Sequence, residues 1–395
     1  MLAGPCATGF MSTECAGEET EVNLLPGPLR ADLAKWERDG RFVEGNLIGQ
    51  NKWLGGVLGR DGSIFAIPGH AKSVLKISPD TQEVKFIGGS FDGDFKWLRG
   101  VLGGDGAIYG IPSWAETVLK IVPETEEVST IGGPLKGEWK WHGGVLGNDG
   151  AIYGIPCNAE SVLKILPSTG EVTTIGGPLV GLNKWYGGIL GPDGAIYGIP
   201  ACAESVLKIV PSTGEVTTIG ILPEGGWKWH GGVLGHDGAI YGLPSNADDV
   251  LRIDCASGEV STFGGPLTSG RHRKDGKYKY LGGVRDADGT IYGMPGDAES
   301  VLRIVPSTRE VTTIGGPFEG ENKWQNGFLG TDGAIYGIPL RAEAVIKIVP
   351  STGQVTTVGG PLPGKDKWEG GVVGLDGALY CIPLRSKAVL RIAPR

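Results

Sequence analysis

The sequence predicts an all-β fold: an eight-bladed β-propeller of four-stranded antiparallel blades, closed by an N-terminal strand that completes the last blade. Three observations lead to this prediction. One motif recurs eight times at a nearly constant spacing, the first seven copies each hold four short β-like runs, and the last copy lacks its fourth run. A period of about 40–45 residues with four strands is typical of a propeller blade, whereas helical repeats show helical apolar spacing.

Each unit opens with Lys-Trp, or with Lys-Tyr in one copy, and the consensus is KWxGGVLGxDGAIYGIPxxAESVLKIVPSTGEVTTIGGPLxG. The units are spaced by 44 residues, except for an interval of 51 between the fifth and the sixth. The opening lysines are Lys52, Lys96, Lys140, Lys184, Lys228, Lys279, Lys323 and Lys367.

Four runs follow one another in each unit. The first, GGVLG, is rich in glycine, which suits the innermost strand, where eight strands crowd around one axis. An Asp-Gly turn leads to the second, AIYGIP, which ends at its proline. The third, SVLKI, ends at the turn Pro-Ser-Thr-Gly, and the fourth, EVTTIGG, carries β-branched residues.

Closure of the ring is predicted from the two ends of the chain. The eighth unit ends at residues 388–395, after its third run, and residues 40–53 align with the end of a unit, with Phe42 and Val43 at the strand positions. We therefore expect residues 40–51 to supply the outer strand of blade eight. Residues 1–39 are then a partly disordered tail, and residues 40–395 form the propeller, which leaves no open sheet edge.

Composition excludes several classes of protein. The net charge of −8 and the pI of about 5.3 argue against nucleic-acid binding, which needs a basic field. No apolar run approaches the roughly 18 residues of a membrane-spanning helix, and the first residues lack the pattern of a secretory signal. The six cysteines follow no repeat position, so we expect free thiols and a reducing, cytoplasmic location.

The repeat resembles propellers of the YVTN-type, kelch-like and streptogramin-lyase-like group, in which the patterns DG-x-[IL]-[YW] and [IV]-x-P-x-T-G-x-[IV] recur. The resemblance covers residues 40–395 at the level of single blades. It implies the propeller fold. Streptogramin-lyase-like members use histidine and glutamate near the axis with a magnesium ion, but no motif here carries those residues over one by one.

Candidate binding residues lie where the copies diverge. The loops between the second and third strands, and those between blades, leave on one face, here called the variable face. The residue before the opening Lys differs between blades, and so does the residue after the repeat Trp. The residues after the Trp, or after the Tyr of the sixth unit, are Leu54, Leu98, His142, Tyr186, His230, Leu281, Gln325 and Glu369. Rigid scaffolds commonly carry binding residues on such loops.

Aromatic residues beside polar ones mark part of this face. Two units contain Trp-Lys-Trp-His, namely Trp139–His142 and Trp227–His230, with Tyr186 in the unit between them. Such residues suit stacking on a sugar or a flat ligand, or anchoring a protein partner. The alternative is that the two units are copies of one duplication whose rings merely pack the loops.

The candidates for metal binding or acid–base chemistry are His142, His230 and Glu369. These residues belong to blades three, five and eight, which are spread around the ring, so we expect them to be too far apart to bind one zinc ion. The sequence therefore predicts no metal, no cofactor and no catalytic residues.

Basic residues form two further candidates. Lys72, Lys387 and His70, with Arg341 and Arg385, would form a basic sector across blades one, seven and eight. The insertion before blade six adds a second basic protrusion, with Arg271, Arg273 and Lys274. Either could steer an acidic partner, although solvated loops would look the same.

Two other features recur in every blade, so we interpret them as structural. The basic residue of the VLKI run and the Asp of the Asp-Gly turn are expected to form a cross-strand ion pair. The ring of Lys-Trp lysines is expected to act similarly, with anion attraction at the pore mouth as the alternative.

Three hypotheses on function stay open. The first is a non-enzymatic binding module or scaffold that uses the variable face for a protein or other partner. The second is a carbohydrate- or small-molecule-binding propeller, and the third is a lyase or hydrolase with a site at the axial mouth. Catalysis is the less favoured reading, because the candidate acids and bases are dispersed along the sequence.

Overall fold

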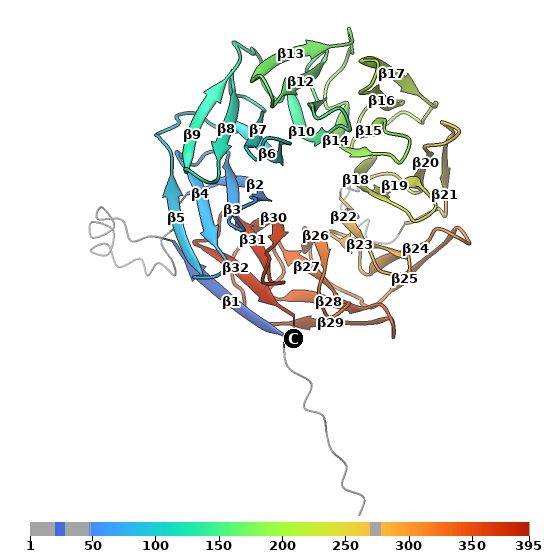
Figure 1. Ribbon diagram of the computed structural model, residues 1–395. Coiled ribbons are helices and arrows are strands. Elements are labelled where there is room, and N and C mark those ends of the chain that lie inside the picture. Colours follow the sequence, from blue (N-terminus) through green and yellow to red (C-terminus); the bar gives the residue numbers. More distant parts are fainter. Residues whose placement is uncertain (1–19, 28–46, 48, 269–277, 395) are drawn as a thin grey trace, which may run out of the picture.

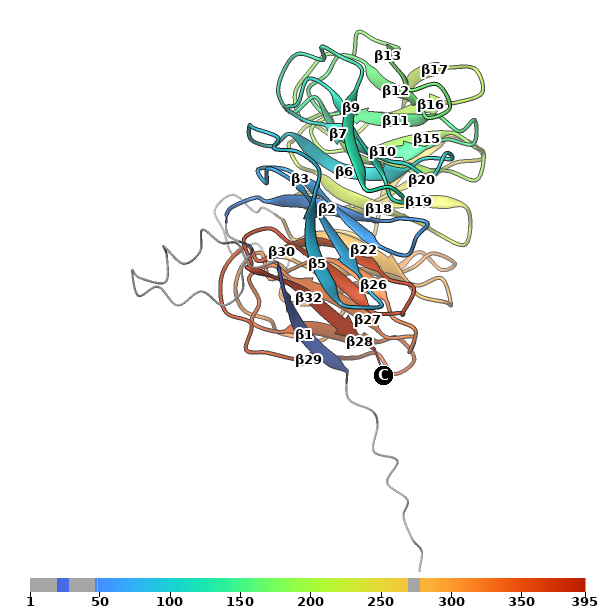
Figure 2. The same ribbon diagram turned by 60° about the vertical axis from the view of Figure 1, so that its left-hand side comes forward.

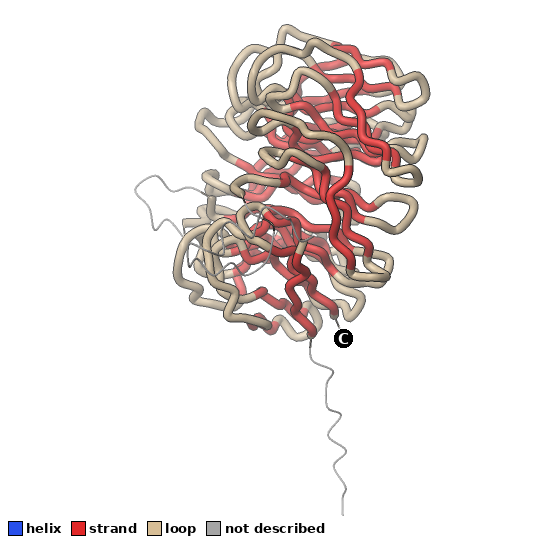
Figure 3. The backbone as a smooth tube through the Cα atoms, turned by 90° about the vertical axis from the view of Figure 1, so that its left-hand side faces the viewer, coloured by secondary structure: helices blue, strands red, loops and turns tan. Residues whose placement is uncertain are grey.

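Residues 20–27, 47, 49–268 and 278–394 are described by a computed structural model. They form eight four-stranded antiparallel sheets arranged as blades around a central axis (Figure 1). The predicted eight-bladed β-propeller is thus confirmed. Seen from the side, strands form the body and loops project on both faces (Figure 3). No helix long and apolar enough to cross a membrane occurs in these described residues.

Each blade runs from an inner to an outer strand. The inner strands are β2 (Trp53–Leu58), β6 (Trp97–Leu102), β10 (Trp141–Leu146), β14 (Trp185–Leu190), β18 (Trp229–Leu234), β22 (Tyr280–Arg285), β26 (Trp324–Leu329) and β30 (Trp368–Val373). The second strands are β3 (Ile64–Pro68), β7 (Ile108–Pro112), β11 (Ile152–Pro156), β15 (Ile196–Pro200), β19 (Ala239–Pro244), β23 (Ile291–Pro295), β27 (Ile335–Pro339) and β31 (Leu379–Pro383).

The outer half of each blade follows the same order. The third strands are β4 (Val74–Ser78), β8 (Val118–Val122), β12 (Val162–Leu166), β16 (Val206–Val210), β20 (Val250–Asp254), β24 (Val301–Val305), β28 (Val345–Val349) and β32 (Ala388–Ala393). The outermost strands are β5 (Glu83–Ile87), β9 (Glu127–Ile131), β13 (Glu171–Ile175), β17 (Glu215–Ile219), β21 (Val260–Phe263), β25 (Glu310–Ile314), β29 (Gln354–Val358) and, for blade eight, β1 (Glu21–Pro26).

An N-terminal strand closes the ring, as predicted, but its position was predicted wrongly. β1 pairs antiparallel with β32, with Leu24 opposite Leu390, and lies at the outer edge of blade eight (Figure 2). The strand was expected within residues 40–51; Phe42 and Val43 lie outside the described residues. The register shows why: residues 21–29, EVNLLPGPL, match EVTTIGGPL, so the insertion before blade one is longer than the loops between other blades.

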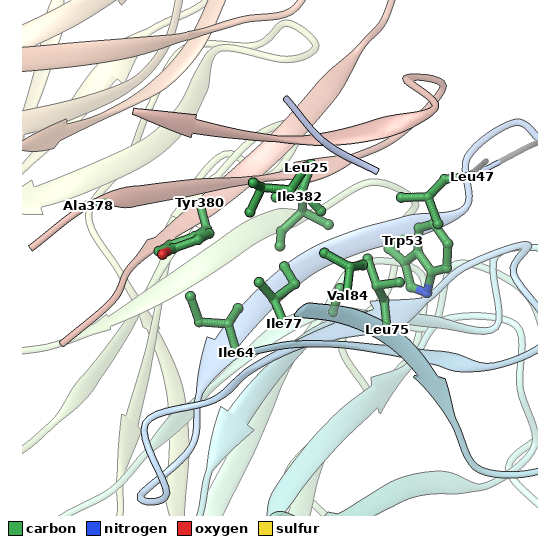
Figure 4. Close-up of a cluster of buried hydrophobic side chains, with 12 residues drawn as sticks. Leu25, Leu47, Trp53, Ile64, Leu75, Ile77, Val84, Ala378, Tyr380 and Ile382 are labelled. Carbon is green, nitrogen blue, oxygen red and sulfur yellow. The ribbon is translucent and has the colours of Figure 1, made fainter. Parts of the chain in front are cut away.

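The core lies between neighbouring blades. At the closure, Leu25 of β1 packs with Tyr380 and Ile382 of blade eight against Ile64 and Ile77 of blade one (Figure 4). Leu25 is only 6% exposed. The N-terminal strand therefore contributes apolar contacts to the seam as well as backbone hydrogen bonds.

The two recurrent features are structural. The Nζ of Lys140 donates to the carbonyls of Ser113 and Gly137, both at 2.8 Å, and Trp141 Nε1 donates to Ser161 O at 2.8 Å. All eight opening lysines are buried, so they fasten loops together rather than present a cationic mouth. The predicted ion pair is confirmed in seven blades: Lys76–Asp61, Lys120–Asp105, Lys164–Asp149, Lys208–Asp193, Arg252–Asp237, Lys347–Asp332 and Arg391–Asp376.

A bulge in each inner strand positions the residues that face the axis. In blade three, Trp141 pairs with Pro156 and Gly144 with Gly154, while His142 and Gly143 between them leave the ladder. Seven blades have the bulge at this place, and blade seven has it between Gln325 and Gly327. Bulges redirect side chains. Here they free the second and third residues of seven inner strands, and in blade seven the third residue alone, because Gln325 pairs with Ile338.

Candidate functional site

Three rings from adjacent blades lie against one another at the axis. The centroids of His142 and Tyr186 are 3.2 Å apart, and those of Tyr186 and His230 are 4.9 Å apart. His142 is buried, whereas Tyr186 and His230 are enclosed by protein yet keep some accessible surface. Partial accessibility deep inside the ring is expected of side chains that line a channel.

These side chains line an axial cavity of about 230 Å³. Arg99 and Asn326 complete its polar lining, and glycines of the inner strands supply most of the remaining wall. Glu369 of blade eight lies outside this lining, but its charge acts on Tyr186, and the charge of Arg99 acts on it. We call Arg99, His142, Tyr186, His230, Asn326 and Glu369 the axial cluster.

The third residue of every inner strand has a left-handed backbone conformation, and six of the eight are glycine. The two exceptions are Arg99 (φ 63°) and Asn326 (φ 56°); the glycines are Gly55, Gly143, Gly187, Gly231, Gly282 and Gly370. Asparagine tolerates this region, but for most side chains it costs roughly 1–2 kcal/mol. Strain of this kind is concentrated at functional sites.

Arg99 also lacks a partner. No hydrogen bond or ion pair joins its guanidinium to another described residue. Its side chain lies close to the glycines of both neighbouring blades: a Cβ on Gly55 would be 3.4 Å from its Cγ, and one on Gly143 would be 3.3 Å from its Cδ. Glycine at these positions therefore leaves the room that the arginine occupies.

The electrostatics of the cluster keep both histidines neutral at pH 7. Burial, and then the charge of Arg99, lower the pKa of His230 to about 4. The same two causes lower the pKa of His142 well below its usual value. Burial raises the pKa of Tyr186 and of Glu369, against the weaker effect of Arg99. Desolvation thus disfavours the charged forms of His142, Tyr186, His230 and Glu369.

Three buried polar atoms of the cluster have no hydrogen-bond partner among the described residues: Nδ1 of His142, Nδ1 of His230 and Nδ2 of Asn326. An unsatisfied buried polar group costs about 1–3 kcal/mol, and native proteins contain few of them. Here three of them belong to residues that line one cavity, which a ligand with polar groups would satisfy.

A second ring of left-handed residues surrounds the mouth, at the position before each opening lysine. Four blades have Asn or Asp there, but the other four have Phe95, Trp139, Trp227 and Tyr278, with φ between 41° and 64°. Aromatic residues are outliers in this region. We call these four residues, with Trp114, the rim aromatics.

The rim aromatics form two groups. Phe95 contacts Trp139 and Trp114, at centroid distances of 4.6 and 5.3 Å. Trp227 contacts Tyr186 at 5.4 Å, so the second group continues into the axial cluster. The residues of both groups come from loops that leave on the variable face.

The structure brings together only some of the predicted residues. His142, Tyr186, Trp227 and His230 form one contact network, whereas Trp139 lies in the separate group with Phe95. His142 and His230 line one cavity and both contact Tyr186, although they come from blades three and five, whereas Glu369 of blade eight does not line it.

The predicted basic sector is largely offset by acids. Arg341 Nε lies 2.8 Å from Asp366, and Arg385 lies 3.7 Å from the same carboxylate. Lys72 pairs with Asp92 and His70 with Asp94. The second predicted basic group, Arg271, Arg273 and Lys274, lies outside the described residues.

Arg99 and Asn326 were missed by the sequence analysis. Their signal was present as a departure from the repeat: Trp-Leu-Arg-Gly and Trp-Gln-Asn-Gly replace the consensus Trp-x-Gly-Gly. The backbone requirement that makes glycine the rule at this position became visible only with the bulge.

The cluster does not fit the magnesium ion implied by the resemblance. Magnesium takes an octahedron of oxygen ligands, whereas the axis offers imidazoles, a phenol, an amide, one carboxylate and an unpaired guanidinium. Within the described ranges, no group of three or more His, Cys, Asp or Glu residues is arranged to hold a metal ion.

The comparisons with known proteins agree with the fold. Residues 144–280, from the inner strand of blade three to the start of blade six, match a sequence family described as "Repeat of unknown function (DUF6923)". No curated protein sequence matches the chain. The chain is thus a β-propeller repeat protein.

Similar solved structures come from different kinds of protein. A streptogramin B lyase has a TM-score of 0.58 and 14% identity, and the match covers 94% of this chain and 97% of the lyase. An inactive variant of virginiamycin B lyase from Staphylococcus aureus, with quinupristin, has a TM-score of 0.58 and 16% identity over 75% of this chain and 94% of that one.

A third similar structure is the extracellular domain of a putative one-component system from B. thetaiotaomicron, with a TM-score of 0.51 and 10% identity. The match covers 86% of this chain and 52% of that one. At such identities the likeness concerns the fold alone.

Proposed function

We propose that this propeller binds a small molecule in the axial cavity, reached from the variable face. The observation that carries the proposal is the set of three unpartnered buried polar atoms, on His142, His230 and Asn326, whose residues line one cavity. Leaving these groups unsatisfied is costly, and a ligand that bonds to them recovers that cost.

A small molecule is favoured over a protein partner by where the blade-specific residues converge. A protein interface would spread anchors over roughly 800 Å² of one face. The residues that differ from the repeat instead meet at the axis, and the arginines of the basic sector are already paired with Asp366.

The size of the cavity limits the ligand. Its volume of about 230 Å³ is below the ~300–1,000 Å³ typical of drug-sized ligands. The cavity therefore suits a small molecule, or the end of a larger one whose body lies between the rim aromatics. Flat rings and sugars are the bodies that aromatic side chains bind best.

The proposal is tested by thermal-shift screening of the full chain against a panel of small organic acids, bases, sugars and aromatic compounds. Compounds that raise the Tm are then measured by calorimetry on the double variant His142→Leu/His230→Leu. Leucine occupies the same position in blades one and two, so this change keeps a residue that the repeat accepts.

Val180→Ser is the matched control, because Val180 is 79% exposed on a loop of the same face and does not line the cavity. We expect binding to be lost in the double variant and kept in the control. Compounds that bind both variants equally well, or a panel without any compound dependent on the histidines, would contradict the proposal.

A lyase or hydrolase is the second candidate. One observation favours it: two neutral imidazoles, whose Nδ1 atoms have no hydrogen-bond partner among the described residues, line one cavity with Tyr186, and neutral imidazoles suit general acid–base work. The streptogramin B lyase shares the fold. Mass spectrometry of a bound compound after incubation separates the two candidates, because an enzyme would convert it and a binding protein would return it unchanged.

A further inference from the structure

We infer that the ligand is anchored by a carboxylate, held by the guanidinium of Arg99 and the amide of Asn326. The inference rests on the proposed function and names the chemistry that the cavity selects. It starts from two residues that depart from glycine at one repeat position and line one cavity.

Arg99 supplies the charge. Its guanidinium forms no hydrogen bond or ion pair with another described residue, although the carboxyl of Glu369 lies within its electrostatic range. The other seven blades avoid a basic residue at this position, and six of them have the glycine that the backbone conformation favours. An arginine kept in a strained and unpaired state is explained if it binds an anion.

Asn326 supplies a second donor. Its Nδ2 is buried and unpartnered, and an amide nitrogen can only donate. Asn326 lines the cavity from blade seven, as Arg99 does from blade two. Oxygen atoms of an anion accept from both, and the fork of an arginine matches the two oxygens of a carboxylate.

The remaining groups limit the charge of the ligand to one. The groups that face Arg99 are His142, His230, Tyr186 and Glu369, and the first three are uncharged at pH 7. They therefore add no positive charge for a dianion. The carboxyl of Glu369 adds no positive charge either, so the guanidinium of Arg99 is the single positive charge of the axial cluster.

The test uses three compounds that share one ring: benzoate, benzamide and phenylphosphonate. They carry about one negative charge, no charge and close to two negative charges at pH 8, and binding to the full chain is measured by calorimetry. We expect benzoate to bind at least about 10-fold more tightly than benzamide, because hydrogen bonds that involve charged groups are stronger than neutral ones by an energy of this order. Phenylphosphonate should bind more weakly than benzoate.

Arg99→Gly is the decisive variant, because it installs the residue of six other blades at a position that favours glycine. We expect it to lose benzoate binding by 10-fold or more while its Tm stays equal or rises. A purely structural arginine would lower the Tm instead. Asn326→Gly should weaken benzoate binding to a smaller extent.

Equal affinities for benzoate and benzamide, or unchanged benzoate affinity in Arg99→Gly, would overturn the inference. Tighter binding of phenylphosphonate than of benzoate would also overturn the inference, because the site would then prefer a dianion to a carboxylate. A neutral compound that depends on His142 and His230 but not on Arg99 would refute the inference and leave the proposed function standing. If no compound depends on either set of residues, both fail.

Discussion

The imidazole of His142 lies 3.2 Å from the ring of Tyr186, centroid to centroid, although the two residues belong to different blades. Both are the second residue of an inner strand, and both leave the ladder at the bulge. At the same position Leu54 instead joins an apolar cluster with Leu98 of blade two, Leu340 of blade seven and Leu384 of blade eight. One backbone device thus gives apolar packing in some blades and a polar contact across blades in others.

Tyr186→Ala and Trp185→Ala should differ in their effects on stability. Trp185 is buried, and its Nε1 donates to Ser205 O at 2.8 Å, so its loss should cost ~3–5 kcal/mol. Tyr186 makes ring contacts but lines a cavity, so its replacement should cost only about 1–2 kcal/mol. Urea denaturation of both variants measures the difference, and equal losses would mean that Tyr186 is a core residue.

Lys184→Met should be strongly destabilising, unlike Lys164→Met in the neighbouring blade. Lys184 Nζ donates to the carbonyls of Cys157, Ala159 and Gly181. Cys157 O also accepts from the backbone N–H of Lys184, so methionine removes the donor of Ala159 O and Gly181 O. We expect a cost of about 2–4 kcal/mol. Lys164 is a partly exposed ion-pair partner of Asp149, 3.7 Å away, for which about 0–1 kcal/mol is expected. Similar midpoints for the two variants in denaturant would show that the buried lysines are not fastening the loops.

The repeat made the fold predictable, because each run, turn and proline recurs with a single physical explanation. Closure by an N-terminal strand was predictable, but the position of that strand was not. The long segment between Pro26 and Trp53 separates Glu21 and Val22, which match the start of a fourth run, from the first blade. The candidate site was half predictable. Tyr186 and His230 stood out as variable residues, but their convergence depends on a bulge that no sequence pattern marks. The importance of Arg99 depends on the same bulge.

Leu25→Ala should destabilise the closed ring, whereas Leu24→Ala should not. Leu25 is 6% exposed and packs into the seam between blades eight and one, while its neighbour Leu24 is 43% exposed. The first change should cost about 2–5 kcal/mol and the second under about 1 kcal/mol. Thermal unfolding followed by circular dichroism compares them, and a chain without residues 1–19 serves as a control that keeps β1. Equal effects of the two alanines would contradict the assignment of β1.

Stability should fall on mild acidification, and the axial histidines should account for part of the loss. The folded pKa of His230 is about 4, below the unfolded value of 6.5, and the folded pKa of His142 is lowered as well. Between pH 6.5 and 4 the unfolded state therefore binds more protons, and stability decreases as the pH falls through this window. Glu369 acts in the opposite direction, because its folded pKa is raised.

At pH 5 we expect His230 alone to remove up to about 2 kcal/mol of stability relative to pH 7. Urea midpoints of the wild type and of His230→Leu, taken at pH 7 and pH 5, measure this contribution. The variant should lose less stability than the wild type between the two pH values, and parallel losses would show that the axial imidazole is already solvated enough to be protonated at no cost.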